Sequence, residues 1–369
     1  MKSVCQTFTL LFILFMPYWQ QTFAQEPEES TEAGECACEQ YRGIAEVYSN
    51  SIRAALVSSQ ASIVDMTDRR LIFNAMRAIP VACHNMLLPM NLIRQRGRTY
   101  TRDGRTPFVS SSDEADRLRR TYTSFIRLFE PYTQTTDCTL AGDRQACILE
   151  NNRKIFQTFQ RTMQGHLPSD VYLYFRLFLS ESEIRTIRLY NEILVGGDIL
   201  SFARANRENY SPEEVWSAIL MLGHQASIDY NYDRIIPDHP DRQGIVTLNE
   251  IRSTARYNME IGAYSSDRGR FPGNRARHGG VCRDIASAQG EILQAFGFRN
   301  TFAVAHETRR SRHMTLISQH PTENRIYRLD YGRDITVSRS DTRALFAGIN
   351  DRSTNYRVYL PAGAQKQTI

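Results

Sequence analysis

One helix with a cysteine at its start constrains the fold of this chain more than any other feature. Residues 285–298 place apolar side chains at helical spacing, and Gly297 near their end is typical of a helix C-terminus. Cys282 comes just before this pattern, after a pair of glycines at 279–280 that lets the backbone approach a substrate closely. The N–H groups and the dipole at a helix N-terminus both favour a thiolate. The sequence therefore predicts a nucleophilic cysteine at the start of a helix.

Two segments after this helix have the composition of strands joined in a hairpin. They span residues 312–318 and 325–331, with a short polar turn between them. If the hairpin is centred at 321–322, His313 lies directly opposite Asp330, with Cβ atoms about 5 Å apart. A slip of one residue would put the two side chains on opposite faces of the sheet. The expected register is therefore a sharp structural prediction.

Together these residues predict a thiol triad. Cys282 would be the nucleophile, His313 the base, and Asp330 the group that orients the imidazole. Each residue also has a simpler interpretation, because a cysteine on an amphipathic helix is often a small buried apolar side chain. A histidine on a strand is often only a polar surface residue. The order and the surrounding elements favour the catalytic interpretation.

This series of features resembles the transglutaminase-like superfamily of papain-like thiol enzymes. The resemblance covers about residues 279–334: a cysteine flanked by small residues, a helix, a Gly-Phe exit into a strand at 301–306, a histidine on the next strand, and a Leu-Asp pair on the one after. It implies an α+β fold and amide chemistry through a thioester. Carried over by position, the catalytic roles fall on Cys282, His313 and Asp330.

The chain departs from the family at one point. Many members have an aromatic residue shortly after the histidine, whereas Met314 and Thr315 follow it here. The departure leaves the triad intact, but the chain would lack the family's usual aromatic wall of the substrate groove.

The whole chain is expected to be an α+β protein with two domains. Residues 36–209 show helical periodicity throughout and form an all-helical domain of unknown role. Residues 210–369 form the transglutaminase-like domain, with its nucleophile at the N-terminus of a helix that packs on an antiparallel sheet. A capping box from Ser211 to Glu214 marks the boundary. The helices expected before it span residues 41–61, 112–131, 151–165 and 180–195.

The beginning of the chain predicts export. Residues 1–24 combine Lys2, an apolar run at 8–16 and small residues before a cleavage point, as a secretory signal peptide does. Residues 25–35 are acidic and lack large apolar side chains, so they predict a disordered leader. No later stretch has the composition of a membrane span. The expected location is the periplasm or the medium.

An exported location favours disulfides. Cys138 and Cys147 flank a turn-rich loop that a local disulfide could close, and either Cys36 or Cys38 could pair with Cys83. One thiol besides the nucleophile would then remain. A zinc site is the weaker alternative, because paired cysteines and histidines at ligand spacing are lacking.

The sequence indicates no cofactor. Residues 239–250 resemble a calcium-binding loop, but His239 replaces its first carboxylate and Gln243 stands at the fifth position, so calcium binding is disfavoured. The net charge of +5 is small and the basic residues are scattered, so a nucleic-acid partner is not indicated. The expected partner is a protein or peptide substrate, which could belong to the cell envelope.

Two classes of function remain open. The first is an exported cysteine enzyme that forms a thioester on Cys282 and passes the acyl group to water, as a protease or amidohydrolase, or to an amine, as a protein transamidase. Of the 45 basic residues only three are lysines, which either base composition or avoidance of self-crosslinking would explain. The second class is a non-catalytic peptide-binding or scaffolding protein of the envelope, built on a degenerate form of the same fold.

Overall fold

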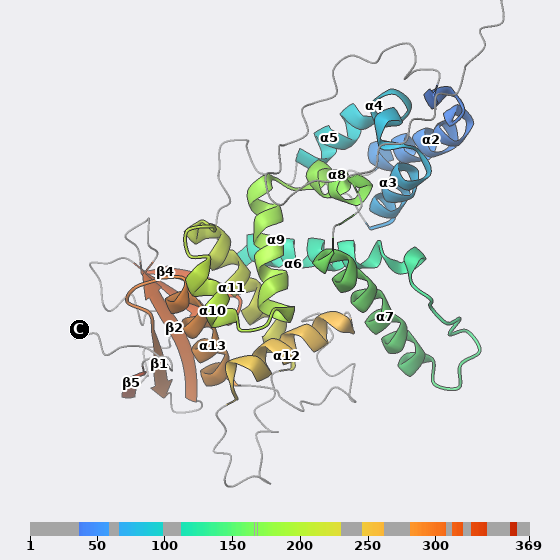
Figure 1. Ribbon diagram of the computed structural model, residues 1–369. Helices are drawn as coiled ribbons and strands as arrows, with labels where there is room; N and C mark the ends of the chain where they lie inside the picture. Colours follow the sequence, from blue (N-terminus) through green and yellow to red (C-terminus); the bar gives the residue numbers. More distant parts are fainter. Residues whose placement is uncertain are drawn as a thin grey trace, which may run out of the picture. The chain divides into compact units, whose positions relative to one another are not determined.

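A computed structural model describes residues 37–58, 66–98, 112–165, 167, 169–229, 246–261, 281–307, 312–319, 326–337 and 355–359. These residues form a series of helices followed by an antiparallel sheet, so the α+β class is confirmed (Figure 1). The chain divides into two compact units. Unit 1 contains residues 1–102 and 167–178, and unit 2 contains residues 103–166 and 179–369. This division differs from a single boundary near residue 210, which stays a prediction.

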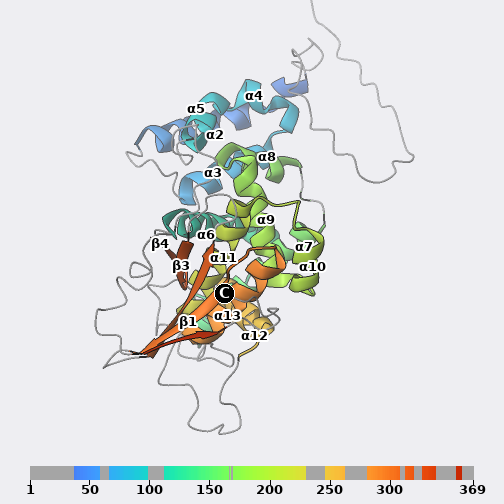
Figure 2. The same cartoon turned by 90° about the vertical axis from the view of Figure 1, so that its left-hand side faces the viewer.

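Unit 1 contains only helices among its described residues (Figure 2). They are α2 (Arg42–Ser58), α3 (Met66–Ala78), the 3-10 turn η1 (Val81–Cys83), α4 (His84–Leu87), α5 (Met90–Arg98) and α8 (Ser169–Phe178). The rings of Phe73 and Tyr174 pack edge to face at 5.6 Å between α3 and α8. A disulfide joins Cys38 to Cys83, which is one of the two pairings expected for Cys83. Cys36 lies outside the described residues.

Unit 2 begins with helices and ends with the sheet. Its helices are α6 (Ser112–Arg127), η2 (Glu130–Tyr132), α7 (Arg144–Gln164), α9 (Glu181–Val195), α10 (Ile199–Ala205), α11 (Pro212–Ala226), η3 (Ser227–Asp229), α12 (Leu248–Glu260) and α13 (Cys282–Ala295). Helix α7 begins seven residues before the expected position, because the side chain of Asp143 caps it by accepting a hydrogen bond from the N–H of Ala146 at 2.9 Å. A disulfide joins Cys138 to Cys147 just before and inside this helix, as expected.

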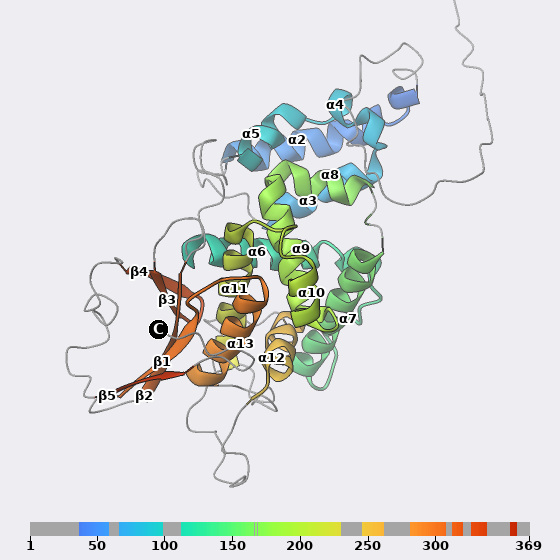
Figure 3. The ribbon, with the colours of Figure 1, turned by 60° about the vertical axis from the view of Figure 1, so that its left-hand side comes forward.

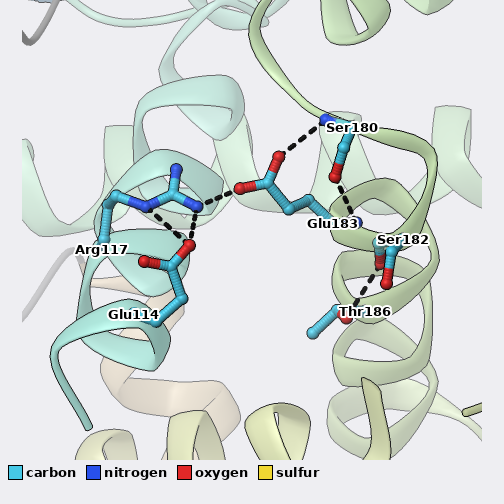
Figure 4. Close-up of polar contacts among 6 residues, drawn as sticks. All are labelled: Glu114, Arg117, Ser180, Ser182, Glu183 and Thr186. Carbon is cyan, nitrogen blue, oxygen red and sulfur yellow. Dashed lines mark hydrogen bonds and ion pairs between the residues drawn. The ribbon is translucent and has the colours of Figure 1, made fainter. Parts of the chain in front are cut away.

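Capping boxes start α9 and α11, as the sequence predicts. Ser180 and Glu183 exchange side-chain and backbone hydrogen bonds at the start of α9, and Ser211 and Glu214 do the same at α11. The buried carboxylate of Glu183 also forms an ion pair with Arg117 of α6, which binds Glu114 as well (Figure 4). One glutamate therefore both caps α9 and ties it to α6.

The sheet has five antiparallel strands in the order β4-β3-β2-β1-β5. They are β1 (Phe302–Glu307), β2 (Arg312–Gln319), β3 (Ile326–Asp330), β4 (Arg333–Val337) and β5 (Asn355–Tyr359). The first three match the expected strands, whereas β4 and β5 add to them. Helix α13 lies between the sheet and α12 (Figures 1 and 3).

The register of the β2–β3 hairpin differs from the prediction. Leu316 pairs with Leu329 and Gln319 with Ile326, so the hairpin is centred between residues 322 and 323. The prediction placed that centre one residue earlier, and each pairing is therefore displaced by two residues. Because side chains alternate faces with a period of two, this displacement leaves His313 and Asp330 on the same face, as diagonal rather than direct neighbours.

Helix α13 ends as the sequence predicts. The N–H of Phe298 donates to the carbonyl of Leu293 at 3.0 Å and the N–H of Gly297 to that of Gln294 at 2.9 Å, with Gly297 at φ 91°. This is a Schellman motif, in which glycine adopts the left-handed conformation without strain. The buried ring of Phe298 then stacks on Trp216 of α11, with centroids 5.9 Å apart. The helix exit thereby aligns β1 with the core.

The predicted leader segments at 1–24 and 25–35 lie outside the described residues. Among the helices that the structure describes, none has both the length and the apolar character needed to cross a membrane.

Candidate active site

Cys282 is the first residue of α13, and it lies in neither disulfide. Its side chain is nearly buried, with 6% of the residue exposed. Asp284 fixes this end of the helix, since one carboxylate oxygen accepts from the N–H of Val281 at 3.0 Å. The other oxygen accepts from the N–H of Val246, just before α12, and from Arg283. The position of the thiol is therefore set from two helices. The glycine pair at 279–280 lies outside the described residues.

The structure brings the other two predicted residues to this thiol. Nε2 of His313 lies 2.9 Å from Oδ1 of Asp330, within hydrogen-bond distance. The imidazole also forms a hydrogen bond with the side chain of Cys282. Because Asp330 engages Nε2, Nδ1 is the ring nitrogen left to face the sulfur. The side chains of His313 and Asp330 keep 24% and 33% of their surface exposed, so solvent reaches the pair.

The surroundings of His313 favour its cationic form. Burial alone would lower the pKa of the imidazolium, but its hydrogen bonds and electrostatic interactions with Asp330 and Cys282 raise this pKa to about 9. At neutral pH the ring therefore carries a positive charge beside the sulfur. An adjacent cation at a helix N-terminus is the environment that stabilises a thiolate.

The turn between β3 and β4 positions Asp330. Tyr331 adopts the left-handed conformation with φ 57°, which allows a two-residue turn directly after the carboxylate. Gln289 of α13 holds this turn, since its side-chain amide donates to the carbonyls of Tyr331 at 2.8 Å and Ile219 at 3.0 Å. The helix that carries Cys282 thus also holds the residue next to Asp330.

Two glycines let the same turn approach α11. A Cβ on Gly223 would lie 2.2 Å from the carbonyl oxygen of Tyr331, and a Cβ on Gly332 would lie 2.1 Å from Cγ of His224. Any larger residue at either position would push the turn away from the helix. No local pattern marks Gly223, Gly332 or Gln289 as residues of the site. Gly223 and Gln289 are a small and an amide residue inside apolar helices, and Gly332 is a turn glycine.

Tyr331 supplies an aromatic ring beside the imidazole. Its ring centroid lies 5.6 Å from that of His313. Met314 and Thr315, which follow the histidine, are both buried. An aromatic contact to the histidine therefore comes from the turn after Asp330 instead.

The described residues include no group of three or more His, Cys, Asp or Glu side chains placed to hold a metal ion. Of the calcium-like pattern at 239–250, Glu250 caps α12 by accepting from the N–H of Thr247 at 2.7 Å. Residues 239–245 lie outside the described part.

The arrangement has the parts that acyl transfer through a thiol requires: a nucleophile, a proton donor and acceptor in contact with it, and a carboxylate that fixes the ring. We found no protein-family model, curated protein or solved structure that matches the chain. The chemistry of the site consequently rests on its geometry.

Proposed function

We propose that this chain is a cysteine enzyme that acts on amide bonds through a thioester on Cys282, with a transglutaminase-like core. The observation that carries the proposal is the contact of His313 with both Cys282 and Asp330. Three residues from a helix and two strands meet in the order and roles that the family resemblance implies. In that family the nucleophile is also expected at the start of a helix that packs on an antiparallel sheet, as Cys282 is at the start of α13.

The reaction follows from the charges of the site. The thiolate of Cys282 attacks the amide carbonyl, and His313 gives its proton to the nitrogen that leaves as an amine. The products of this half-reaction are a thioester on Sγ and a neutral imidazole. His313 then removes a proton from the acceptor, which attacks the thioester and regenerates the thiolate and the imidazolium. Asp330 orients the ring throughout.

The acceptor decides whether the enzyme is a hydrolase or a transamidase. Water yields a carboxylic acid and makes the enzyme a protease or amidohydrolase, whereas a lysine amine yields a new amide bond. Both reactions share every step up to the thioester. We favour hydrolysis, because water reaches the partly exposed His313 and Asp330.

We further propose that the protein is exported and meets its protein or peptide substrate in the cell envelope or outside the cell. The Cys38–Cys83 and Cys138–Cys147 disulfides support this location, since such bonds persist in oxidising compartments. The signal-like segment at 1–24 supports it independently.

Alkylation of Cys282 by iodoacetamide between pH 4 and 9 tests the proposal. An activated thiolate reacts well below the ordinary thiol pKa of about 8.5. We expect such labelling in the wild type, a strong decrease of the low-pH rate in His313→Gln, and no low-pH labelling in Cys282→Ala, with any label on Cys36 assigned separately by peptide mapping. His84→Gln is a matched control, because His84 is a buried histidine that hydrogen-bonds two backbone carbonyls in unit 1. This variant should keep the low-pH rate.

An ordinary thiol titration that His313→Gln does not change would contradict the proposal. It would favour the second class of function, a peptide-binding protein that keeps the fold without the chemistry. If labelling shows an activated thiolate, release of amine from a peptide pool or incorporation of a labelled amine then separates hydrolysis from transamidation.

A further inference from the structure

Arg328 of β3 is a buried cation that the triad does not use. Only 4% of the residue is exposed. Its Nε and Nη1 have no hydrogen-bond partner among the described residues, and no described carboxylate forms an ion pair with it. A buried guanidinium is costly unless hydrogen bonds and an opposite charge compensate it. Arg328 is therefore a buried cation whose Nε and Nη1 find no acceptor among the residues that the structure describes.

The strand register places Arg328 next to the triad. Arg328 pairs with Ile317 of β2, so its side chain shares a face of the sheet with Asp330, two residues further along β3. By the same alternation, His313 of β2 shares this face. The negative charge of Asp330 acts on Arg328 and counteracts the lowering of its pKa by burial. That charge also serves His313, so it does not replace a hydrogen-bonded anion for Arg328.

Thr315 adds a second unsatisfied group on this face. It lies between His313 and Ile317 along β2, diagonal to Arg328. The residue is 2% exposed, and its hydroxyl lacks a hydrogen-bond partner among the described residues. Two neighbouring strands thus present a guanidinium and a hydroxyl, both of which can donate to the same acceptor.

We infer that Arg328 and Thr315 form a subsite for a carboxylate of the substrate, beside the bond that Cys282 attacks. A carboxylate accepts two parallel N–H bonds from one edge of a guanidinium and a third bond from a hydroxyl. Each bidentate edge of the guanidinium combines Nη2 with either Nε or Nη1, so a carboxylate would satisfy one of the two unpaired nitrogens together with the hydroxyl, and would neutralise the buried charge. The substrate class is then a peptide with a carboxylate close to the scissile amide, either its C-terminus or an acidic side chain. This inference rests on the proposed function.

A series of alkylating reagents measures whether Cys282 has such a neighbour. We would use ω-iodoalkanoic acids of two to six carbons and their primary amides, and divide each acid-to-amide rate ratio by the ratio measured with N-acetylcysteine. At the chain length that spans the gap from Sγ to the guanidinium, the acid should react about 10- to 100-fold faster than its amide, as charge-assisted hydrogen bonds imply.

The variants assign the effect. In Arg328→Gln the preference for the acid should disappear, and in Arg328→Lys part of it should remain. Thr315→Val should reduce it several-fold and Thr315→Ser should restore it. Arg333→Gln is the matched control, since it removes an exposed arginine that lies opposite Asp330 in the strand register of β3 and β4. If Arg328→Gln fails to fold, the Lys and Thr315 variants still decide the question.

Several outcomes would overturn the subsite. One is an acid-to-amide ratio equal to that of N-acetylcysteine at every chain length. Another is an equal slowing of acids and amides in Arg328→Gln, which would make Arg328 a positioning residue for Asp330. A third is the same loss in Arg333→Gln, which would indicate a general positive field. In all three, low-pH labelling of the wild-type protein by iodoacetamide would persist, whereas failure of the proposed function would abolish it.

Protection against labelling distinguishes the two sources of the carboxylate. Acetyl-triglycine carries a C-terminal carboxylate, acetyl-Gly-Glu-Gly-amide carries a side-chain carboxylate, and acetyl-triglycinamide carries neither. Slower labelling with one of the first two, lost in Arg328→Gln, identifies the source. Equal protection by all three peptides would contradict the inference.

Discussion

Different interactions stabilise unit 1 and the part of unit 2 that carries the triad. In unit 1, apolar helices are joined by a disulfide that closes a loop across 45 residues. His84 also binds two backbone carbonyls there. Around the triad the described residues form no disulfide, and buried polar side chains bind backbone groups at several points: Asp284 holds the start of α13, and Gln289 holds the turn after Asp330. A disulfide restricts the unfolded chain, whereas directed hydrogen bonds fix atoms in the folded state. Accurate placement is what a catalytic site requires.

The largest expected effect is that of Asp330→Asn on turnover. The variant keeps the shape of the side chain but removes the charge that supports the imidazolium, so the rate should fall about 10³- to 10⁴-fold. The measurement is kcat/KM for an amide substrate, or the labelling rate at pH 6 until a substrate is known. The free energy of unfolding, measured in urea, should change far less than the rate. A comparable loss in Asp334→Asn, whose carboxylate accepts from Trp216 at 3.2 Å, would show that any carboxylate near the turn matters.

The same variant should shift the pH dependence. His313 must be protonated to release the amine, so wild-type turnover should stay high to pH 8 and fall as the pH rises through about 9. In Asp330→Asn this alkaline limit should move down toward 6.5, the ordinary histidine value. The contribution of the His313–Asp330 pair to stability depends on pH in the same direction. It is complete below about pH 6.5 and is lost as the pH rises through about 9. An alkaline limit that stays near 9 would contradict this role of Asp330.

The next effect concerns the Cys38–Cys83 disulfide. Replacing both cysteines by serine should lower the stability of unit 1 by about 4 kcal/mol, the loop-closure value for 45 residues. Urea unfolding followed by circular dichroism measures the loss. Low-pH labelling of Cys282 should not change, since the triad lies in unit 2. A parallel loss of reactivity would show that the triad depends on unit 1.

A smaller effect should come from Gln289→Leu. The variant removes two hydrogen bonds to backbone carbonyls and should cost about 1 to 3 kcal/mol of folding free energy. Because one of these carbonyls follows Asp330, the labelling rate at pH 6 should also fall, about tenfold. Gln294→Leu is the matched control: this glutamine on the same helix donates to the carbonyl of Thr301 at 3.0 Å. It should lose stability without losing reactivity.

The smallest effect is expected for Ser180→Ala, which removes the N-cap of α9. The cost should be about 1 kcal/mol, as for other caps, with no change in the labelling rate. Thermal unfolding and the pH 6 rate measure the two quantities. A change in the rate would show that polar contacts remote from the triad also place its atoms.

The sequence predicted the parts of the site that local patterns encode. The helix that starts at Cys282, its end at Gly297, and the strands that carry His313 and Asp330 each have a signal within a few residues. The hairpin register was wrong by two residues, because a polar turn does not define its own centre. The prediction that His313 and Asp330 share a face survived this error because a displacement of two restores the parity.

The contacts that position the triad were not predictable in the same way. The turn after Asp330 is held by Gln289 and approached by Gly223, both of which lie far from it in the sequence. No local pattern pairs a glycine such as Gly223 with a carbonyl more than a hundred residues away. The fit of Gly332 against α11 is equally invisible in the sequence. The strands β4 and β5 were likewise missed. Arg328 looked like an ordinary strand residue, and only the register and its burial show that it lies beside Asp330.

The strand order has a consequence for biosynthesis. β5, at residues 355–359, pairs with β1 and covers the edge that β2 leaves open. The fifth strand therefore cannot pair until the ribosome has synthesised residue 359. Until then the outer edge of β1 displays unpaired backbone groups, which are a template for intermolecular association. A premature stop codon or a proteolytic cut ahead of Asn355 would make that edge permanent, and the truncated product should aggregate even though Cys282, His313 and Asp330 are all present in it.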